Sequence, residues 1–489
     1  MATGLLEATF VHAQNHGGPG RIRAELAELG VLIQSNSNGI AVRANGQLDD
    51  NGLSKLGPLL ASLGKVRALD LSETQIASLE PLRRLTTLRS LDISGTKVVN
   101  LEPLKGLVAL RSLDASGTDV ASLAPLARLT ALRSLDVSGT DVASMAPLRG
   151  LTALESLSVP GTAVTSLEPL RRLTALRSLD VSGTAVATLE PLVGSTALRS
   201  LNLSGTKVVG LEHLAKLTAL QSLELAQSLV ADIEPLRGLT SLQSLNLSRS
   251  QVASLEPLRV LPGLRSLDLS GAVVANFEQL GALTALESLN LSGTRVENLE
   301  QLKGLTTLHL LDLSGTRIAN LDQLRALTAL QSLDLTLTQV VSLESLKWFT
   351  TLSSLNLSGT RVASLEPLRV VRSLRSLDLT GTEVASVEPL RGFSALQRLD
   401  LSGTEVASLE PLRDLIALRS LDLAQTPITS LEPLRALTAL RSLDVSGTQV
   451  SSLEPVYSLP GLHLRNAGDL AEAILKPFLE YRTERQLPQ

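Results

Sequence analysis

Aspartate returns through this chain at a fixed interval of 22 residues, in 12 of the 18 copies of one repeated segment. If each copy contributes one strand to a parallel sheet, these carboxylates form a row with a spacing of ~4.8 Å. Such a row would offer an acidic groove to a basic protein surface, and calcium between neighbouring carboxylates would suit the preference of hard cations for oxygen. Because the chain lacks glycine-rich ligand loops, we expect no bound metal. The carboxylates predicted to bind a partner are Asp268, Asp312, Asp334, Asp378, Asp400 and Asp422.

A second interpretation of the aspartates needs no ligand. Stacked carboxylates repel one another, but an arginine three residues earlier can partly neutralise the row, as Arg375 does for Asp378. In this interpretation the residues of the pattern Ser-x-Asp-x-Ser form a solvated face, and the pattern recurs only because the whole segment is repeated.

The other groups that could catalyse a reaction do not form a catalytic arrangement. The chain has no cysteine, which excludes a disulfide framework, a thiolate zinc site and a cysteine nucleophile. Its 5 histidines fall on different copies or outside them. Every serine and aspartate that could join a triad belongs to the repeated pattern, so its presence has a structural explanation. We therefore predict a protein that is not an enzyme and that needs no cofactor.

The repeated segment that must position the aspartates is shown by residues 374–395, LRSLDLTGTEVASVEPLRGFSA. With residue 374 as position 1, leucines at positions 4 and 6 alternate with polar residues at 3, 5 and 7, which is typical of a strand with one buried face. Gly381 and Thr382 then turn the chain, and apolar residues at positions 11 and 14 point inward again. Positions 15–18, Glu-Pro-Leu-Arg, are too short for a three-turn helix and predict 3₁₀ or extended backbone. Glu and Arg of this segment can pair on the outer side.

The segment returns without insertion or deletion over residues 66–461. A period of this length with leucines at positions 1, 4 and 6 indicates a leucine-rich repeat solenoid, in which stacked copies share one core. The pattern LxxLxLxxTxV resembles the bacterial leucine-rich repeats of the internalin type. The resemblance implies an α/β solenoid, a curved horseshoe or arc with a parallel β-sheet on the concave face and short 3₁₀ or extended segments on the convex face. That family usually carries asparagine at position 9, where its amide bonds the backbone of adjacent coils. Because threonine stands there in 15 of 18 copies, we expect a threonine ladder in its place.

The two ends of the chain depart from the repeat and are predicted to be caps, which solenoids need at their open edges. We expect an N-terminal cap of helix plus strand over residues 1–36 and a longer, helix-bearing first repeat over residues 37–65. The eighteen regular repeats fill residues 66–461, and a helical C-terminal cap follows over residues 462–489.

Local patterns predict the elements of these caps. At the N-terminal end we expect a helix over residues 21–29, a hairpin or tight turn across Ser35–Gly39 and a second helix over residues 48–63. Ile40, Val42 and Asn45 would then stand at positions 4, 6 and 9. At the C-terminal end residues 469–483 predict an amphipathic helix that covers the last coil, with a kink or break at Pro477. Its apolar face would consist of Leu470, Ile474, Leu475, Phe478 and Leu479.

Residues 220–285 break the repeat pattern. Three successive copies lose the threonine of position 9, and Arg249 replaces the usual glycine of position 8. Leu229 and Val273 place apolar groups at position 10, which is usually polar. This segment is interpreted as a softer hinge, as a recognition patch, or as neutral drift.

A second irregularity is Leu337 together with Trp348, the only tryptophan of the chain. An exposed tryptophan is typical of a binding hot spot. The alternative is that Trp348 folds down over Leu346 and Phe349 as part of the convex packing.

Composition narrows the function further. The net charge of −4 and the aromatic content of 2% argue against a nucleic-acid partner. The sequence contains no stretch of eighteen apolar residues, so we expect no membrane insertion. Because no secretory signal is evident, a cytoplasmic location is expected, with signal-independent secretion left open. We predict a monomeric protein-interaction scaffold that binds a protein partner through its concave surface. The alternatives are an exported bacterial effector that binds a host protein, a structural protein that binds a repetitive surface such as glycan or ice, and a recently duplicated array without a refined partner.

Overall fold

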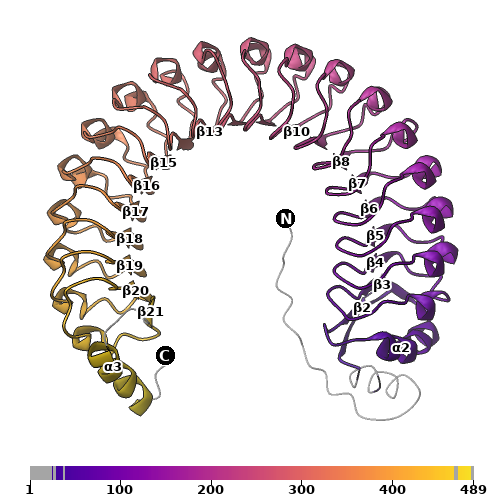
Figure 1. Ribbon diagram of the computed structural model, residues 1–489, viewed down its shortest axis with the longest axis horizontal. Coiled ribbons are helices and arrows are strands. Elements are labelled where there is room, and N and C mark those ends of the chain that lie inside the picture. The colour runs from indigo at the N-terminus through magenta and orange to yellow at the C-terminus, as the bar shows by residue number, and fades with distance from the viewer. Residues whose placement is uncertain (1–24, 26–28, 37–38, 467–471, 486–489) are drawn as a thin grey trace. The chain divides into compact units, whose positions relative to one another are not determined.

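The computed structural model describes residue 25 and residues 29–36, 39–466 and 472–485. The chain divides into two compact units, Met1–Leu220 and Gln221–Gln489, and each is described by itself. Within each unit the strands of successive repeats lie side by side on the concave side, and short helical turns lie on the convex side (Figure 1). The helix predicted over residues 21–29 lies almost entirely outside the described residues.

Each repeat contributes one short strand to a parallel sheet. Leucine at position 4 of one strand lies opposite leucine at position 4 of the next, as in the pairing of Leu333 with Leu355. In unit 1 the strands are β1 (Val31–Asn36), β2 (Gly39–Ala44), β3 (Val66–Asp70), β4 (Ser90–Asp92), β5 (Ser112–Asp114), β6 (Ser134–Asp136), β7 (Ser156–Ser158), β8 (Ser178–Asp180) and β9 (Ser200–Asn202). In unit 2 they are β10 (Ser222–Glu224), β11 (Ser244–Asn246), β12 (Ser266–Asp268), β13 (Ser288–Asn290), β14 (Leu310–Asp312), β15 (Ser332–Asp334), β16 (Ser354–Asn356), β17 (Ser376–Asp378), β18 (Arg398–Asp400), β19 (Ser420–Asp422), β20 (Ser442–Asp444) and β21 (His463–Leu464).

The convex segments are 3₁₀ turns, as predicted. The proline at position 16 needs no hydrogen-bond partner because it has no amide hydrogen, and the next residue donates to the carbonyl three residues back, as Leu390 does to Val387 at 2.9 Å. The turns of unit 1 are Glu80–Leu82, Glu102–Gly106, Ala124–Arg128, Ala146–Gly150, Glu168–Leu170, Glu190–Leu192 and Glu212–Leu214. Those of unit 2 are Glu234–Gly238, Glu256–Val260, Glu278–Ala282, Glu300–Leu302, Asp322–Ala326, Glu344–Trp348, Glu366–Val370, Glu388–Leu390, Glu410–Leu412, Glu432–Leu434 and Glu454–Val456.

The core lies between the strands and the 3₁₀ turns. Seven positions of a repeat, 1, 4, 6, 11, 14, 17 and 20, bury apolar side chains, and stacking joins them into a continuous apolar interior. In the repeat that begins at residue 374 these side chains are Leu374, Leu377, Leu379, Val384, Val387, Leu390 and Phe393. This arrangement is the predicted α/β solenoid.

The threonines of position 9 are buried in the expected place, except for the half-buried Thr448, but their hydroxyl groups bond within their own repeat. Thr316 Oγ1, for example, donates to the Leu313 carbonyl at 2.6 Å. The expected ladder is therefore a series of local bonds, because the short hydroxyl reaches the carbonyl three residues back. In the irregular repeats this bond is lost: the buried hydroxyls of Ser228 and Ser250 have no partner, and Ala272 has no hydroxyl.

The N-terminal elements confirm the predicted hairpin and second helix but correct the alignment of the first repeat. Strands β1 and β2 pair antiparallel, and β2 pairs parallel with β3. The irregularity between Ile40 and Ala41 shifts the register, so that Val42 lies opposite Leu69 and occupies position 4 rather than the predicted position 6. Arg43 then stands at position 5, where its guanidinium lies 3.2 Å from the carboxylate of Asp70.

The predicted second helix is α2 (Asp50–Leu63). The Asp49 carboxylate accepts the amide hydrogen of Gly52 at 2.8 Å and caps its N-terminus. Gly64 ends the helix with a φ of 69°, which favours glycine.

The C-terminal helix α3 (Glu472–Glu484) packs against the last repeat and continues through Pro477 without the predicted break. Phe478 is buried edge-to-face against Tyr457, with ring centroids 5.9 Å apart. Arg482 is also buried, and its guanidinium donates to the Leu459 carbonyl at 3.0 Å. These contacts anchor the turn after Pro477, whereas Leu479, predicted on the same face, is 38% exposed. The predicted Leu470 lies outside the described residues.

Candidate functional site

The aspartates of position 5 have a local structural role. The strand leaves the amide hydrogen of position 7 without a partner in the sheet, and the side chain two residues earlier supplies an acceptor. Asp312 Oδ1 accepts from the Ser314 amide at 2.9 Å, and Asp334 Oδ1 accepts from the Thr336 amide at 2.8 Å. All 12 aspartates of the row make this bond.

The chain itself shows that this bond requires an oxygen rather than a charge. Asparagine replaces aspartate at four copies and makes the same bond, as Asn290 Oδ1 does with the Ser292 amide at 2.9 Å. Ser158 stands at position 5 in the one repeat whose position 7 is proline, Pro160, which has no amide hydrogen to satisfy. The repeated aspartate is therefore explained by turn geometry, and its charge is available for another purpose.

Replacing Asp312 by alanine is expected to lower the free energy of unfolding by about 1–2 kcal/mol, because the Ser314 amide loses its acceptor. Replacement by asparagine keeps the acceptor and is expected to stay within about 0.5 kcal/mol of the wild type. Urea-unfolding midpoints followed by circular dichroism measure the difference. Ser158→Ala is the control, and it should leave the midpoint unchanged. Equal losses for alanine and asparagine would show that the charge itself stabilises the strand.

The six predicted partner-binding carboxylates do not form one continuous row. Asp312 lies opposite Asp334, and Asp378, Asp400 and Asp422 follow one another on adjacent strands, so the set contains one pair and one run of three carboxylates. Asp268 stands apart, because both of its neighbours at position 5 are asparagines. Neutral residues thus interrupt the acidic face that the sequence predicts.

The C-terminal cap covers Asp422, whereas the other five predicted carboxylates are half-buried. Asp422 is 8% exposed, and Arg465 lies 3.1 Å from its carboxylate. Burial raises the pKa of the Asp422 carboxyl above its usual value, and Asp400 and Asp444 add to this rise, while the Ala424 amide and Arg465 oppose it. Asp422 therefore does not offer a free carboxylate to a partner. The sequence did not indicate this, because residues 462–466 have no repeat pattern from which to place Arg465.

The five irregular residues lie on two different surfaces of unit 2. Leu229, Arg249, Val273 and Leu337 follow their strands at positions 8 and 10, and all four are exposed. Trp348 ends a 3₁₀ turn on the convex side. The structure thus separates the tryptophan from the other four.

Trp348 is 52% exposed, whereas the neighbouring Phe349 is fully buried at the core position 20 of the same repeat. The tryptophan lines a shallow hollow of about 480 Å³ together with Pro367 and Val370 of the next repeat. Lys347 approaches the ring at 5.7 Å from its centroid. Of the two interpretations of Trp348, the structure supports exposure.

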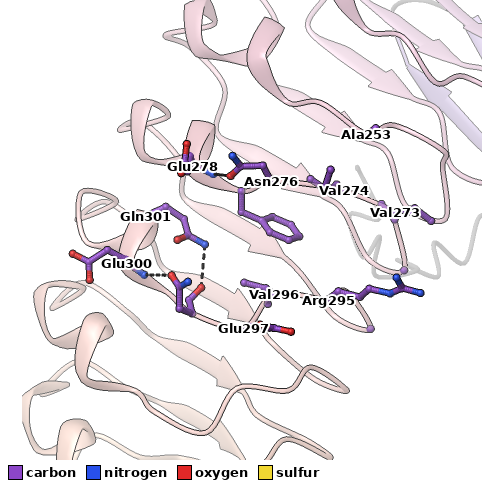
Figure 2. Close-up of a pocket in the computed structure, with 16 residues that line it drawn as sticks. Ala253, Val273, Val274, Asn276, Glu278, Arg295, Val296, Glu297, Glu300 and Gln301 are labelled. Atoms are coloured by element: carbon purple, nitrogen blue, oxygen red, sulfur yellow. Dashed lines mark hydrogen bonds between the residues drawn. The ribbon is translucent and has the colours of Figure 1, made fainter.

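A larger hollow that the sequence did not indicate opens between the repeats that begin at residues 264 and 286. Its volume is about 1220 Å³, and its apolar lining includes Val274, Phe277 and Val296. Figure 2 shows Val273 and Arg295 toward one end of it and Glu278 and Glu300 toward the other. Two sequence signals accompany the opening, phenylalanine at position 14 and glutamine in place of the convex proline at residues 279 and 301.

The charges of the convex surface are arranged as predicted. Glutamate at position 15 pairs with arginine at position 18, as Glu366 does with Arg369 at 2.9 Å. The arginine holds the pKa of the Glu366 carboxyl below its usual value. Because both side chains are exposed, such pairs add little stability. The same pairing occurs at Glu388–Arg391, Glu410–Arg413 and Glu432–Arg435.

Comparison with known proteins agrees with this geometry. A family model described as "Leucine Rich repeats (2 copies)" matches residues 394–436 and 416–458. The chain is built of leucine-rich repeats, and these repeats resemble those of the internalins. An internalin (InlF) from Listeria monocytogenes is 25% identical to this chain, with a TM-score of 0.59. The match covers 68% of this chain and 96% of the internalin chain.

Two further solved structures share the fold. The protein LIC12759 from Leptospira interrogans is 20% identical, with a TM-score of 0.65 over 81% of the leucine-rich repeat protein and all of that chain. The plant peptide hormone receptor RGFR1, solved in complex with RGF2, is 16% identical, with a TM-score of 0.56 over 89% of this chain and 82% of that chain. None of the curated proteins matches the leucine-rich repeat protein. Among its described residues, no helix has the length and apolar character that a bilayer crossing requires.

Proposed function

We propose that this leucine-rich repeat protein is a non-enzymatic scaffold that binds a protein partner, and that Trp348 and Val370 form the centre of one contact surface. The observation that carries the proposal is the exposure of these two side chains, 52% and 60%, side by side on a hollow of the convex surface. Tryptophan is enriched at binding hot spots because one rigid ring supplies a large contact area.

The surroundings of Trp348 have the composition of a protein interface. Val370 and Pro367 supply apolar surface next to the ring, and Glu344, Lys347 and Glu366 surround it with charge. An apolar centre with a polar rim is the usual arrangement of protein–protein contacts. The interrupted carboxylate row gives less support to a repetitive partner such as glycan or ice, because identical ladders would suit such a surface better.

The test is affinity capture with the full-length protein from lysates of the source cell and of a host cell. The host-cell lysate tests the more specific proposal that the protein is an exported effector that binds a host protein. The test variant is Trp348→Ala with Val370→Ser, and the control is Val260→Ser, which alters an exposed residue at position 19 of another repeat. We expect one partner that the wild type and the control capture and that the test variant loses.

A second variant addresses the predicted concave surface. Asp312, Asp334, Asp378 and Asp400 are replaced together by asparagine, which keeps each turn and removes only the charge. A partner that is lost in this variant and retained by the Trp348 variant would move the contact to the concave face. The absence of any captured protein would overturn the scaffold proposal and lead to glycan arrays and ice-growth assays.

A further inference from the structure

One edge of unit 2 carries charges that the fold does not use. Positions 8 and 10 follow each strand, and six successive repeats present one large side chain there. We call these residues the edge strip, and all six are exposed: Arg249, Val273, Arg295, Arg317, Leu337 and Arg361. The other six residues at positions 8 and 10 of these repeats are glycine or glutamine, so the strip contains no carboxylate.

The four arginines of the edge strip have no ion-pair partner among the described residues. The basic residues that form ion pairs in unit 2 lie at other positions, on the convex turns, at the strand starts and in the C-terminal cap. Arg295 and Arg317 stand in neighbouring repeats, so their like charges repel each other. The intramolecular contacts of the fold therefore give no account of this concentration of positive charge.

Two members of the edge strip also strain the backbone. Most repeats place glycine at position 8, but Arg249 and Leu337 occupy it with φ values of 52° and 55°. A side chain in this left-handed conformation costs about 1–2 kcal/mol relative to one in the usual region. Leu337 is nevertheless 68% exposed, so burial of its side chain does little to offset that strain.

The apolar members of the strip are placed to receive apolar side chains. Val273 is 65% exposed and stands at the hollow lined by Val274, Phe277 and Val296. Figure 2 shows Arg295 close to the same end of that hollow. Along the edge, each of the two apolar side chains thus has an arginine in the repeat before it and in the repeat after it.

We infer that the edge strip of unit 2 docks an extended, acidic segment of a partner protein whose carboxylates lie between apolar side chains. This inference rests on the proposed scaffold function but uses a surface other than the Trp348 patch. Arg249 and Arg361 are five repeats apart, which corresponds to ~24 Å at the strand spacing and to roughly seven residues of extended chain.

Charge and composition favour a peptide over a nucleic acid. The edge strip contains no aromatic residue on which bases could stack. The neighbouring concave face carries the carboxylates of position 5, which would repel a long polyanion. Beyond the strip, position 10 becomes acidic at Glu383 and Glu405, and this limits the length of an acidic ligand.

The experiment measures fluorescence anisotropy of a labelled peptide of about ten alternating glutamate and leucine residues with the full-length protein, at low and at physiological salt. The test variant is Arg295→Gln with Arg317→Gln and Arg361→Gln. The matched control, Arg369→Gln with Arg391→Gln and Arg413→Gln, removes the same charge from the convex turns. We expect the peptide to bind the wild type and the control, and to bind the test variant at least tenfold more weakly.

Leu337→Gly supplies a second readout, because glycine relieves the strain while it removes the apolar contact. We expect weaker peptide binding with an unfolding midpoint equal to or above that of the wild type. Equal weakening by the two arginine triples, or no peptide binding at all, would overturn the inference. Tighter binding of a single-stranded DNA of similar length, dependent on the same arginines, would replace the acidic peptide by a nucleic acid. The scaffold proposal is tested separately, because Trp348 and Val370 are intact in all of these variants.

Discussion

Replacement of Phe349 by alanine is expected to lower the free energy of unfolding by about 3–5 kcal/mol. Phe349 fills position 20, where most repeats have leucine, and its side chain is fully buried behind the turn Glu344–Trp348. Truncation removes apolar contacts and leaves a cavity that the stacked repeats cannot close, because the neighbouring strands fix their spacing. The shift of the urea-unfolding midpoint measures the effect.

The adjacent residue provides the matched comparison for this prediction. Trp348→Ala removes a larger side chain, but about half of that side chain already contacts water. We expect this variant to lose about 1 kcal/mol or less. A loss for Trp348→Ala as large as that for Phe349→Ala would mean that Trp348 belongs to the core, and the proposed contact surface would then lose its support.

Replacement of Phe478 by aspartate is expected to detach helix α3 from the last repeat. Phe478 is 2% exposed and packs against Tyr457, so aspartate at this position would lose that apolar contact. It would also bury a carboxylate whose neighbouring cation, Arg482, already donates to the Leu459 carbonyl. The free energy lost with this packing, together with the cost of burying the charge, exceeds the free energy that docks a short helix through a few side chains. Detachment would uncover Tyr457 and the buried Leu459, which Phe478 and Arg482 of the helix contact. Increased binding of a hydrophobic dye and concentration-dependent aggregation in size-exclusion chromatography would report this change.

Leu479→Asp is the control for the cap. It introduces the same charge one residue later on the same helix, at a side chain that is 38% exposed. We expect a monodisperse protein with the dye binding of the wild type. If both aspartate variants aggregate, the helix itself, rather than the contact of Phe478, would be the sensitive element.

The sequence predicts those features of the fold that depend on local chemistry. The alternation of leucine and polar residues predicts each strand, proline at position 16 predicts the 3₁₀ turn, and Asp49 and Gly64 predict the ends of α2. Each of these residue patterns determines the backbone conformation of residues only a few positions away in the sequence. The 22-residue period then extends them to the whole array.

The features that the sequence did not predict depend on contacts between elements. The register of β2 follows from the irregularity at Ile40, which no local residue pattern indicates. The pairing of Arg465 with Asp422 joins residues 43 positions apart, and it occupies the Asp422 carboxylate. Trp348 could be packed or exposed at its position, and the outcome depends on Phe349, which occupies the buried place.

The candidate surfaces divide in the same way. Leu229, Val273 and Leu337 were evident as departures from the repeat, and all three are exposed. The repeat pattern does not distinguish the arginines of position 10, because arginine is common in the chain and only the structure shows which of its described arginines form no ion pair. Their role in binding stays a prediction, as does that of the concave aspartates.

At position 5, the hydrogen-bond acceptor that the turn needs is independent of the charge of the side chain that supplies it. The fold needs an oxygen that accepts one amide hydrogen, and both aspartate and asparagine supply it with the same geometry. Each repeat that carries aspartate or asparagine at position 5 can therefore gain or lose one negative charge through a single substitution that leaves its backbone unaltered. Repeats such as those with Asp312, Asp334 and Asn356 form a series of sites whose charge can be set one by one, so the electrostatic pattern of the sheet can diverge, or be designed, without a matching change in the core.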